Sequence, residues 1–541
     1  MFDLPNQDSV SRRDLLKAAS LAAVGSWGIP QLTRSFAAEV ESSLLGEFLT
    51  AEKTTEGLVG DTGLHWGWSN LTDRDGLVGS GAGEPLTIES LDPAFPGTDD
   101  FTISLKVHTV GTDAETVGDL LTKFDPDSRT GFQLGVITNA GVTNSQANVR
   151  QVQFGLDAGT EPVIVDCGRP GNNVYIFSLI SHKDELYCST CEPNVGEAGH
   201  VYRYAGGETW EDCGAPDLCN AVSALASFNG ELYAGTAKYN LAGSKLTPSM
   251  NENRGGGIYR YLGNKQWEDC GRIGECPAVF GLIQYRGSLV ASSLYAPAGV
   301  YAYAGGQKWN FLGTAPDNKR VEAMTVYKGQ IYGTGFNAGE IYRYEGGTNW
   351  KTVGVLPDTT QTYGFAIYGG ELYVSTWPTA IVYRYVSDGV WEPCGRPGME
   401  LESMPLAVYN GKMYTGTLPL GELYRYDGGS NWGRIEQLDK TVDATYRRAW
   451  SMAVHQGKLY CGTLPSGRVY SIEVGQVVTA DLPGKEGWQH IAVVRSGNEL
   501  SLYLNGHPAV KKTFSGSQPL NLANAKSWLV GGGNHSPLRG G

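Results

Sequence analysis

The chain has 541 residues, of which 41% are hydrophobic and 11% aromatic, so it is longer than one ordinary domain and can bury sizeable cores. Its net charge of −14 argues against a nucleic-acid partner, because phosphates attract basic surfaces. We expect no membrane span, because no stretch beyond the N-terminal region reaches the ~18 apolar residues that a spanning helix needs.

The first 38 residues carry the pattern of an export signal. Arg12 and Arg13 precede Leu15, and a weakly apolar stretch leads to small residues at Ala37 and Ala38. This pattern resembles the twin-arginine signal peptide, with Leu15 where phenylalanine is common. The resemblance implies cleavage near Ala37 or Ala38 and export of a folded protein to a periplasmic, cell-surface or extracellular location. The alternative is a surface helix that happens to carry two arginines.

The next region, from about residue 45 to 160, contains several short strand candidates and no repeat. Residues 101–107 alternate apolar and polar side chains, as a half-buried strand does. Further candidates cover residues 118–123, 131–136 and 149–154. We interpret this region as the first part of a β-sandwich.

Residues 161–474 are dominated by one repeated pattern, Leu-Tyr-x-Gly-Thr followed by Val-Tyr-Arg-Tyr-x-Gly-Gly-x-x-Trp. Its copies recur roughly every 40–50 residues, and each holds two hairpins and therefore four strands. This is typical of a β-propeller blade. The Gly-Gly…Trp spacing resembles kelch-type propellers and, more loosely, the Asp-box of sialidases. We read the recurrent Tyr, Arg and Trp as packing.

The number of blades follows from a strand that lies upstream of the first repeat. Seven copies have the Leu-Tyr strand, but only six have the tryptophan strand. Residues 161–171 match residues 391–398 closely, with Ile164 in the tryptophan position. We therefore predict a seven-bladed β-propeller whose last blade is completed by this upstream strand, which closes the ring and leaves no open sheet edge.

Nine cysteines fit an oxidising compartment. Cys213 and Cys219 are separated by five residues, and so are Cys270 and Cys276 at the equivalent place one blade later. This recurrence predicts two local disulfides.

Strand candidates resume after the propeller, in residues 481–541. Residues 488–495 and 500–506 read Trp-Gln-His-Ile-Ala-Val-Val-Arg and Leu-Ser-Leu-Tyr-Leu-Asn-Gly, and a candidate at 527–530 follows. The first two closely resemble a strand and a hairpin of the laminin G-like, concanavalin A-like jelly roll. The resemblance implies that both flanks form one jelly roll, interrupted by the propeller. The family usually has another strand after residue 530, so either the C-terminal end is truncated or the sheet has an unpaired edge. The alternative is two separate small modules.

Function is expected where the seven copies disagree, because repeated residues build the scaffold. At the start of the first strands, blades four to seven bring charged and aromatic residues to one rim. These are Arg320, Glu322, Tyr363, Glu402, Arg447 and Arg448. Glu322 and Glu402 are candidates for an acid/base pair in glycoside hydrolysis. The alternative is structural ion pairs between adjacent blades.

Two loop aromatics, Tyr239 and Trp377, are further candidates for stacking on a sugar ring or capping the channel. Calcium is possible at Asp73, Asp75, Asp99 and Asp100, although turn-forming aspartates explain them as well. We expect no other cofactor. The leading hypothesis is an exported protein that binds a glycan or an extracellular protein without catalysis. The alternative is a glycan-active enzyme, a glycosidase or polysaccharide lyase, with its site at the rim.

Overall fold

The computed structural model describes residues 67–68, 77–78, 86–88, 96–109, 118–138, 150–336, 338–482 and 487–531. The export signal predicted for residues 1–38 lies outside these ranges, as do Asp73 and Asp75. The predicted all-β fold is confirmed: the elements in the described parts are strands and two short 3-10 turns, η2 (Leu241–Ser244) and η3 (Pro316–Asn318). None of the helices in these parts is long and apolar enough to cross a membrane.

The repeats form one eight-stranded antiparallel sheet, β9 to β16, whose two halves are called units one and two here, and five four-stranded antiparallel sheets, called units three to seven. Units one to three comprise β9 (Tyr175–His182), β10 (Glu185–Cys191), β11 (Val201–Gly206), β12 (Thr209–Asp212); β13 (Ala221–Phe228), β14 (Glu231–Ala237), β15 (Gly257–Gly263), β16 (Gln266–Arg272); and β17 (Val279–Tyr285), β18 (Ser288–Ser293), β19 (Val300–Tyr303), β20 (Trp309–Phe311). Units four and five comprise β21 (Met324–Tyr327), β22 (Gln330–Thr334), β23 (Glu340–Gly346), β24 (Asn349–Val355); and β25 (Gln361–Tyr368), β26 (Glu371–Trp377), β27 (Tyr383–Ser387), β28 (Val390–Pro393). Unit six comprises β29 (Glu402–Tyr409), β30 (Lys412–Leu418), β31 (Glu422–Tyr426) and β32 (Trp432–Gln437).

Unit seven closes the ring with a strand from before the first repeat. Its strands are β33 (Arg448–His455), β34 (Lys458–Leu464), β35 (Val469–Glu473) and β8 (Val163–Asp166). Ile472 pairs with Ile164 and Tyr470 with Asp166, as the sequence predicted. The first strand of each unit packs beside that of the next, and β33 returns to β9. Strands β9 and β13 are buried along their whole length because neighbouring units cover both faces.

Tryptophans tie successive units together. In six units the indole Nε1 on the fourth strand donates to a backbone carbonyl of the preceding unit: Trp210 to Cys167 (2.7 Å), Trp267 to Cys213 (3.0 Å), Trp309 to Cys270 (2.8 Å), Trp350 to Leu312 (2.9 Å), Trp391 to Val353 (3.0 Å) and Trp432 to Cys394 (2.9 Å). Unit seven has Ile164 in this position, which has no N–H to donate. The repeated tryptophans therefore serve the architecture.

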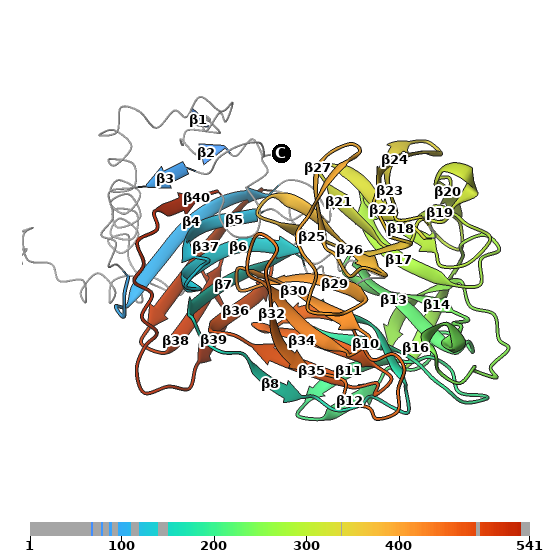
Figure 1. The fold of residues 1–541 in the computed structure, drawn as a ribbon. Helices are drawn as coiled ribbons and strands as arrows, with labels where there is room; N and C mark the ends of the chain where they lie inside the picture. The colour runs from blue at the N-terminus through green and yellow to red at the C-terminus, as the bar shows by residue number, and fades with distance from the viewer. Residues whose placement is uncertain are drawn as a thin grey trace, which may run out of the picture.

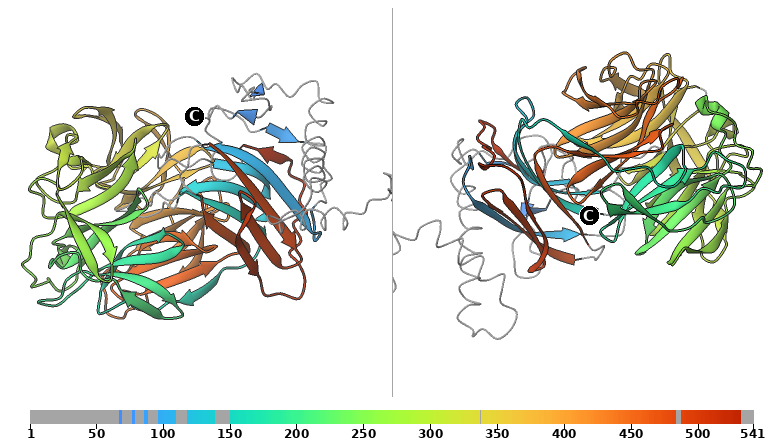
Figure 2. Two further views of the ribbon diagram at one scale, coloured as in Figure 1. Left: turned by 180° about the vertical axis from the view of Figure 1, so that it is seen from behind. Right: turned by 90° about the horizontal axis from the view of Figure 1, so that it is seen from below.

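Strands from both sides of the ring share two facing sheets. One sheet has the order β3 (Leu86–Ile88), β40 (Trp528–Val530), β5 (Gly118–Asp125), β6 (Thr130–Thr138), β7 (Arg150–Ala158) and β36 (Gln476–Asp481). The other has the order β39 (His507–Thr513), β38 (Glu499–Leu504), β37 (Gly487–Ser496) and β4 (Phe101–Thr109). A separate pair joins β1 (Gly67–Trp68) and β2 (Leu77–Val78). Figures 1 and 2 show this sandwich beside the ring.

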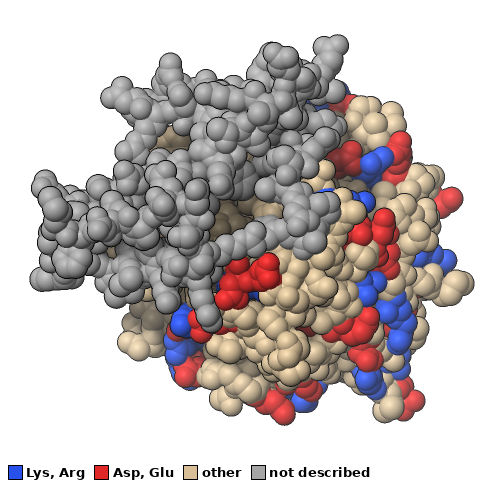
Figure 3. Space-filling model, turned by 90° about the vertical axis from the view of Figure 1, so that its left-hand side faces the viewer, with Lys and Arg blue, Asp and Glu red and all other residues tan. Residues whose placement is uncertain are grey.

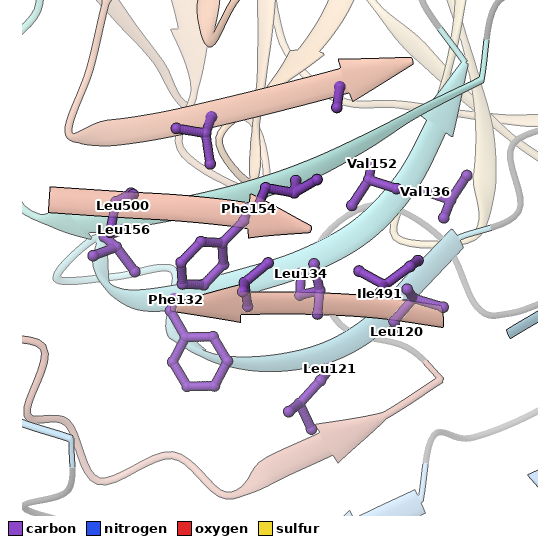
Figure 4. Close-up of a cluster of buried hydrophobic side chains, with 14 of the residues drawn as sticks. Leu120, Leu121, Phe132, Leu134, Val136, Val152, Phe154, Leu156, Ile491 and Leu500 are labelled. Carbon is purple, nitrogen blue, oxygen red and sulfur yellow. The ribbon is translucent and has the colours of Figure 1, made fainter. Parts of the chain in front are cut away.

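The sandwich core lies between the two sheets. Phe132, Leu134 and Phe154 from the larger sheet meet Ile491 and Leu500 from the smaller one (Figure 4). Each of these five side chains is fully buried. Because each of the two sheets combines strands from both flanks, the complete sandwich core forms only when the two flanks come together.

The opposite face of the larger sheet packs on the ring through polar side chains. Asn410, in the turn between β29 and β30, donates to the Val474 carbonyl (2.8 Å) and accepts from Gln133 Nε2 (2.9 Å). Lys412 Nζ lies 2.5 Å from Asp157 Oδ2, and both side chains are buried. This interface is therefore hydrogen-bonded and ion-paired. Elsewhere on the sandwich side, acidic and basic residues are interspersed over the described surface (Figure 3).

Candidate functional site

The first strands of the ring begin at one end of the central axis, and a cluster of aliphatic and aromatic side chains gathers there. We call it the axial cluster; its buried aromatic members are Tyr175, Phe177, Phe280, Tyr363 and Trp450. Tyr175 and Phe177 have ring centroids 4.3 Å apart, and Trp450 meets Tyr175 edge to face at 5.2 Å. The rim that the sequence predicted therefore lies at the closed centre of the ring.

Two ion pairs are embedded in this cluster. Arg320 Nε lies 2.7 Å from Glu322 Oε1, and the guanidinium of Arg320 lies over the ring of Phe336 at 3.8 Å. Across the boundary between units six and seven, Arg448 lies 3.7 Å from Glu402 Oε2. Glu322 is 2% exposed and Glu402 is 1% exposed. The pair of Glu402 and Arg448 matches the predicted ion pair between adjacent blades, whereas Glu322 pairs with an arginine of its own unit.

Burial sets the protonation of these carboxyl groups. Burial raises the pKa of Glu322 to about 7, opposed by Arg320 and assisted by the charge of Glu402. Burial also raises the pKa of Glu402, against the pull of Arg448. A general acid at neutral pH needs such a pKa, but it must also reach its substrate.

A loop from unit two covers the axial cluster. Tyr239 packs edge to face on Phe177 at 4.8 Å, and its hydroxyl lies 2.8 Å from Ser244 Oγ. Ser244, in η2, accepts a 2.7 Å hydrogen bond from Arg448 across the axis. Tyr239 therefore packs over the axial cluster, and its predicted role in stacking or capping stays a prediction.

Buried polar atoms remain unpaired beneath this loop. Among the described residues, the Tyr175 hydroxyl, Glu402 Oε1 and Arg448 Nε have no hydrogen-bond partner. The Tyr175 hydroxyl and Arg448 Nε can donate a hydrogen bond, and Glu402 Oε1 can accept one. A hydroxyl group both donates and accepts, so it could pair with any of these atoms.

Half-buried aromatic side chains surround the cluster and form what we call the aromatic rim: Tyr295, Phe336, Trp377 and Tyr446. Trp377 was predicted in a loop, but it is the last residue of β26 and meets Tyr446 edge to face at 6.2 Å. It pairs with Gln361 across the hairpin, which extends the strand beyond the predicted end. Tyr295, Phe336 and Tyr446 were not among the predicted residues. The residues that follow the second strand also differ between the copies, and this difference could have indicated Phe336 and Tyr295.

Arg447 differs from its neighbour Arg448. Its Nε donates to the Thr441 carbonyl at 2.6 Å and so braces the loop before β33. Of the predicted binding residues, Arg320, Tyr363, Arg448, Tyr239 and Trp377 come together at the axial end, and Arg447 serves that local loop.

The two predicted disulfides are not formed, because all nine cysteines are free and buried. Cys213 Sγ lies 3.8 Å from the Glu211 carbonyl and Cys219 Sγ lies 3.2 Å from the Ala221 carbonyl. Cys270 and Cys276 likewise face the carbonyls of Glu268 and Ala278. Each thiol packs near a carbonyl two residues away, so the equal spacing reflects the repeat and not a cross-link.

Asp100 is engaged in a turn. Its carboxylate accepts hydrogen bonds from the Gly497 amide (2.6 Å) and the Ser496 hydroxyl (3.2 Å). In the parts of the chain that the structure describes, no three His, Cys, Asp or Glu side chains are grouped as a metal site.

Comparison with known proteins gives fold likeness alone. No family model matches the chain, and no curated protein matches it. An inactive variant of virginiamycin B lyase from Staphylococcus aureus with quinupristin is 10% identical over 58% of this chain and 100% of that chain, with a TM-score of 0.47. YCF48 bound to D1 peptide (12%, TM-score 0.40) and the WD40 β-propeller domain of Doa1 (11%, TM-score 0.41) each cover 58% of this chain and 97% of theirs. These likenesses carry no functional argument.

Proposed function

We propose that the protein is an exported, non-catalytic carbohydrate-binding protein whose site is the axial end of the propeller. The observation that carries the proposal is the aromatic rim around a cluster that contains unpaired polar atoms. Aromatic faces pack on the apolar faces of sugar rings, while a few convergent polar groups fix their hydroxyls. The side chains of Trp377 and Tyr446 are half-buried, so part of each ring remains accessible for such packing. The side chains of Tyr175, Glu402 and Arg448 are buried behind them.

Burial favours binding over hydrolysis. Glycoside hydrolysis needs two carboxyl groups that flank the scissile bond and touch it. Glu322 and Glu402 are almost completely buried, and each is ion-paired. The raised pKa of Glu322, about 7, is the observation that keeps a glycan-active enzyme as the second candidate.

The compartment and the finer relationships belong to the same proposal. The Arg12–Arg13 pattern supports export by the twin-arginine route. The motifs at residues 488–495 and 500–506 support a laminin G-like sandwich, and they lie on the paired strands β37 and β38. The Gly-Gly…Trp spacing supports a kelch-like propeller.

A glycan array followed by calorimetric titration of any bound sugar tests this function. Trp377→Ala and Tyr446→Ala should each weaken binding about tenfold, because each removes a half-buried ring from the rim. Trp488→Ala is the matched control on the sandwich, where the side chain is 45% exposed. Loss of binding in the control alone would assign the site to the sandwich and contradict the proposal.

The enzyme alternative is tested on the same sugars. Release of new reducing ends or unsaturated products by the wild-type protein, abolished in Glu322→Gln, would establish catalysis. We expect binding without turnover.

A further inference from the structure

The ring has a second end, where each first strand turns into the second strand, and strand β36 of the sandwich lies across three of these turns. Asn410 of unit six donates to the Val474 carbonyl just before β36 (2.8 Å). The Gly457 amide of unit seven donates to Thr479 Oγ1 (2.9 Å), and the Asp184 amide of unit one to Asp481 Oδ2 (3.2 Å). One extended segment therefore binds three successive turns.

The next turn around the ring, in unit two, has the same backbone and an open outer side. Lys183 and Asp184 have φ values of 50° and 58°, and Asn229 and Gly230 have 51° and 75°. A Cβ placed at Gly230 would meet nothing within 4 Å, whereas one at Gly457 would collide with the Val477 carbonyl of β36.

A groove of about 410 Å³ lies beside this turn, between units one and two. At the end of the first strand, four units have a tyrosine whose hydroxyl donates to a turn glycine of the next unit: Tyr285 to Gly329 (3.3 Å), Tyr327 to Gly370 (3.1 Å), Tyr368 to Gly411 (3.4 Å) and Tyr409 to Gly457 (2.9 Å). Unit one has His182 there, and its Nδ1 reaches only Ser227 Oγ (2.8 Å). His182 lines the groove, at the position where the other four units have the tyrosine.

The same histidine–serine contact recurs between units seven and one, where the sandwich covers it. His455 Nδ1 lies 2.9 Å from Ser181 Oγ. Gln151 Nε2 of the sandwich donates to Ser181 Oγ (3.3 Å) and to Asp481 Oδ1 (3.0 Å). The sandwich thus covers this interface with an amide from β7 and a carboxylate from the extended strand β36.

The groove between units one and two is lined by two basic side chains, and each of them has a carboxylate beside it. Lys183 and Arg260 line it with side chains 64% and 37% exposed, and Tyr187 and Tyr261 supply aromatic walls. Glu231 lies 4.0 Å from Lys183, and Glu268 pairs with Arg260 at 2.5 Å.

We propose that this groove is a docking site for an extended segment of a partner protein that carries an acidic side chain, held as β36 is held on the neighbouring turns. The Gly230 amide takes the place of the Asp184 amide, and Lys183 and Arg260 face the carboxylate. The site is at the opposite end of the first strands from the axial cluster, so it is independent of the carbohydrate proposal.

The probe is a capped, fluorescently labelled hexapeptide with the sequence of residues 476–481, Gln-Val-Val-Thr-Ala-Asp, titrated by anisotropy against the full-length protein. We expect saturable binding that Lys183→Glu weakens at least about fivefold, since it reverses a charge beside the carboxylate. Lys328→Glu is the matched control, at the same turn position in unit four, where Tyr327 crosses to Gly370. It should change binding less than about twofold.

A second variant closes the groove without changing its charge at neutral pH. His182→Tyr places a phenol where the other units have one and should weaken binding at least about tenfold. Four outcomes would overturn the proposal: no saturation at millimolar peptide, equal binding by Lys183→Glu, an equal loss in Lys328→Glu, or displacement of the peptide by glucuronate at equal concentration. The last would show that a carboxylate alone suffices.

Discussion

Glu322 and Glu402 show how neighbours fix what a side chain can do. Both occupy positions where the repeats disagree, which made them candidates for catalysis. In the folded chain each lies beside an arginine and almost out of reach of solvent. The same residue types in an open pocket would suit glycoside hydrolysis, so exposure decides between the two roles.

The raised pKa of Glu322 predicts a pH-dependent stability. Its folded-state pKa of about 7 exceeds the ordinary 4.5, so the folded state holds a proton that the unfolded state has released. The contribution of Glu322 to the free energy of unfolding is therefore greatest at low pH and falls as pH rises from 4.5 to 7. Relative to Glu322→Gln, the free energy of unfolding of the wild type should fall by about 1–3 kcal/mol between pH 4.5 and 7. Above pH 7 the difference between the two proteins should stay constant.

Urea unfolding of both proteins at several pH values measures this difference. Other buried groups titrate nearby: burial raises the pKa of Glu192 and Glu400 to about 7 and lowers that of His182 and His455 to about 4. They are common to both proteins and cancel in the comparison. A difference that does not change with pH would contradict the prediction.

The inter-unit tryptophans give a second prediction for single residues. Trp309→Phe keeps an aromatic six-membered ring but removes the indole N–H and its 2.8 Å hydrogen bond to the Cys270 carbonyl. It should therefore cost about 1–2 kcal/mol of unfolding free energy. Tyr303→Phe, which removes an exposed hydrogen bond on the neighbouring strand, should cost less than about 0.5 kcal/mol. Equal costs in the two variants would show that the indole N–H contributes nothing specific.

At the scale of elements, the larger sheet of the sandwich is covered on both faces. Along β6 and β7, phenylalanine and leucine alternate with glutamine, a pattern that usually places the polar side chains in water. Gln133, Gln151 and Gln153 are instead buried at the ring, each at most 2% exposed. The alternation correctly predicts that the larger sheet has two different faces. Only the packing of the ring against the polar face shows that both faces are buried.

Asn410 should contribute strongly to this junction. Asn410→Ala removes three hydrogen bonds from a side chain that is 1% exposed, and should cost about 2–4 kcal/mol of unfolding free energy. Asn229→Ala is the matched control, since Asn229 has a similar positive φ (51° against 44°) on an exposed turn. Any strain of alanine in the left-handed region is therefore common to both variants. If both variants lose the same free energy of unfolding, the hydrogen bonds of Asn410 to the sandwich contribute nothing to stability.

For the whole molecule, closure of the ring lets the sandwich be interrupted. Strand β8 follows β7 directly in the chain and pairs with β35, and β36 returns to pair with β7. The chain thus leaves and re-enters the sandwich at neighbouring strands. An insertion whose ends lie side by side does not separate the strands of its host.

This arrangement predicts that the ring folds alone. Residues 161–474 expressed by themselves should be monomeric and unfold cooperatively. The surface of the ring that contacts the sandwich carries polar side chains such as Asn410 and Lys412, and water can solvate these when the sandwich is absent. Residues 169–474, which lack β8, should aggregate or lose cooperativity, because β35 then has an unpaired edge. Size-exclusion chromatography and thermal melts followed by circular dichroism compare the two. Identical behaviour would show that closure by β8 is dispensable.

The sequence alone determined the all-β fold, the repeat, the strand that closes it and the rim where the copies differ. These follow from local periodicity, which each stretch of chain carries within itself. The tertiary structure alone decided which charges pair, that the cysteines stay free, how the turns hold the sandwich and where a groove opens. Those depend on contacts across the closed ring, such as Arg448 with Ser244, 204 positions apart. No local pattern records such contacts, because they arise only when the ring closes and brings distant units together.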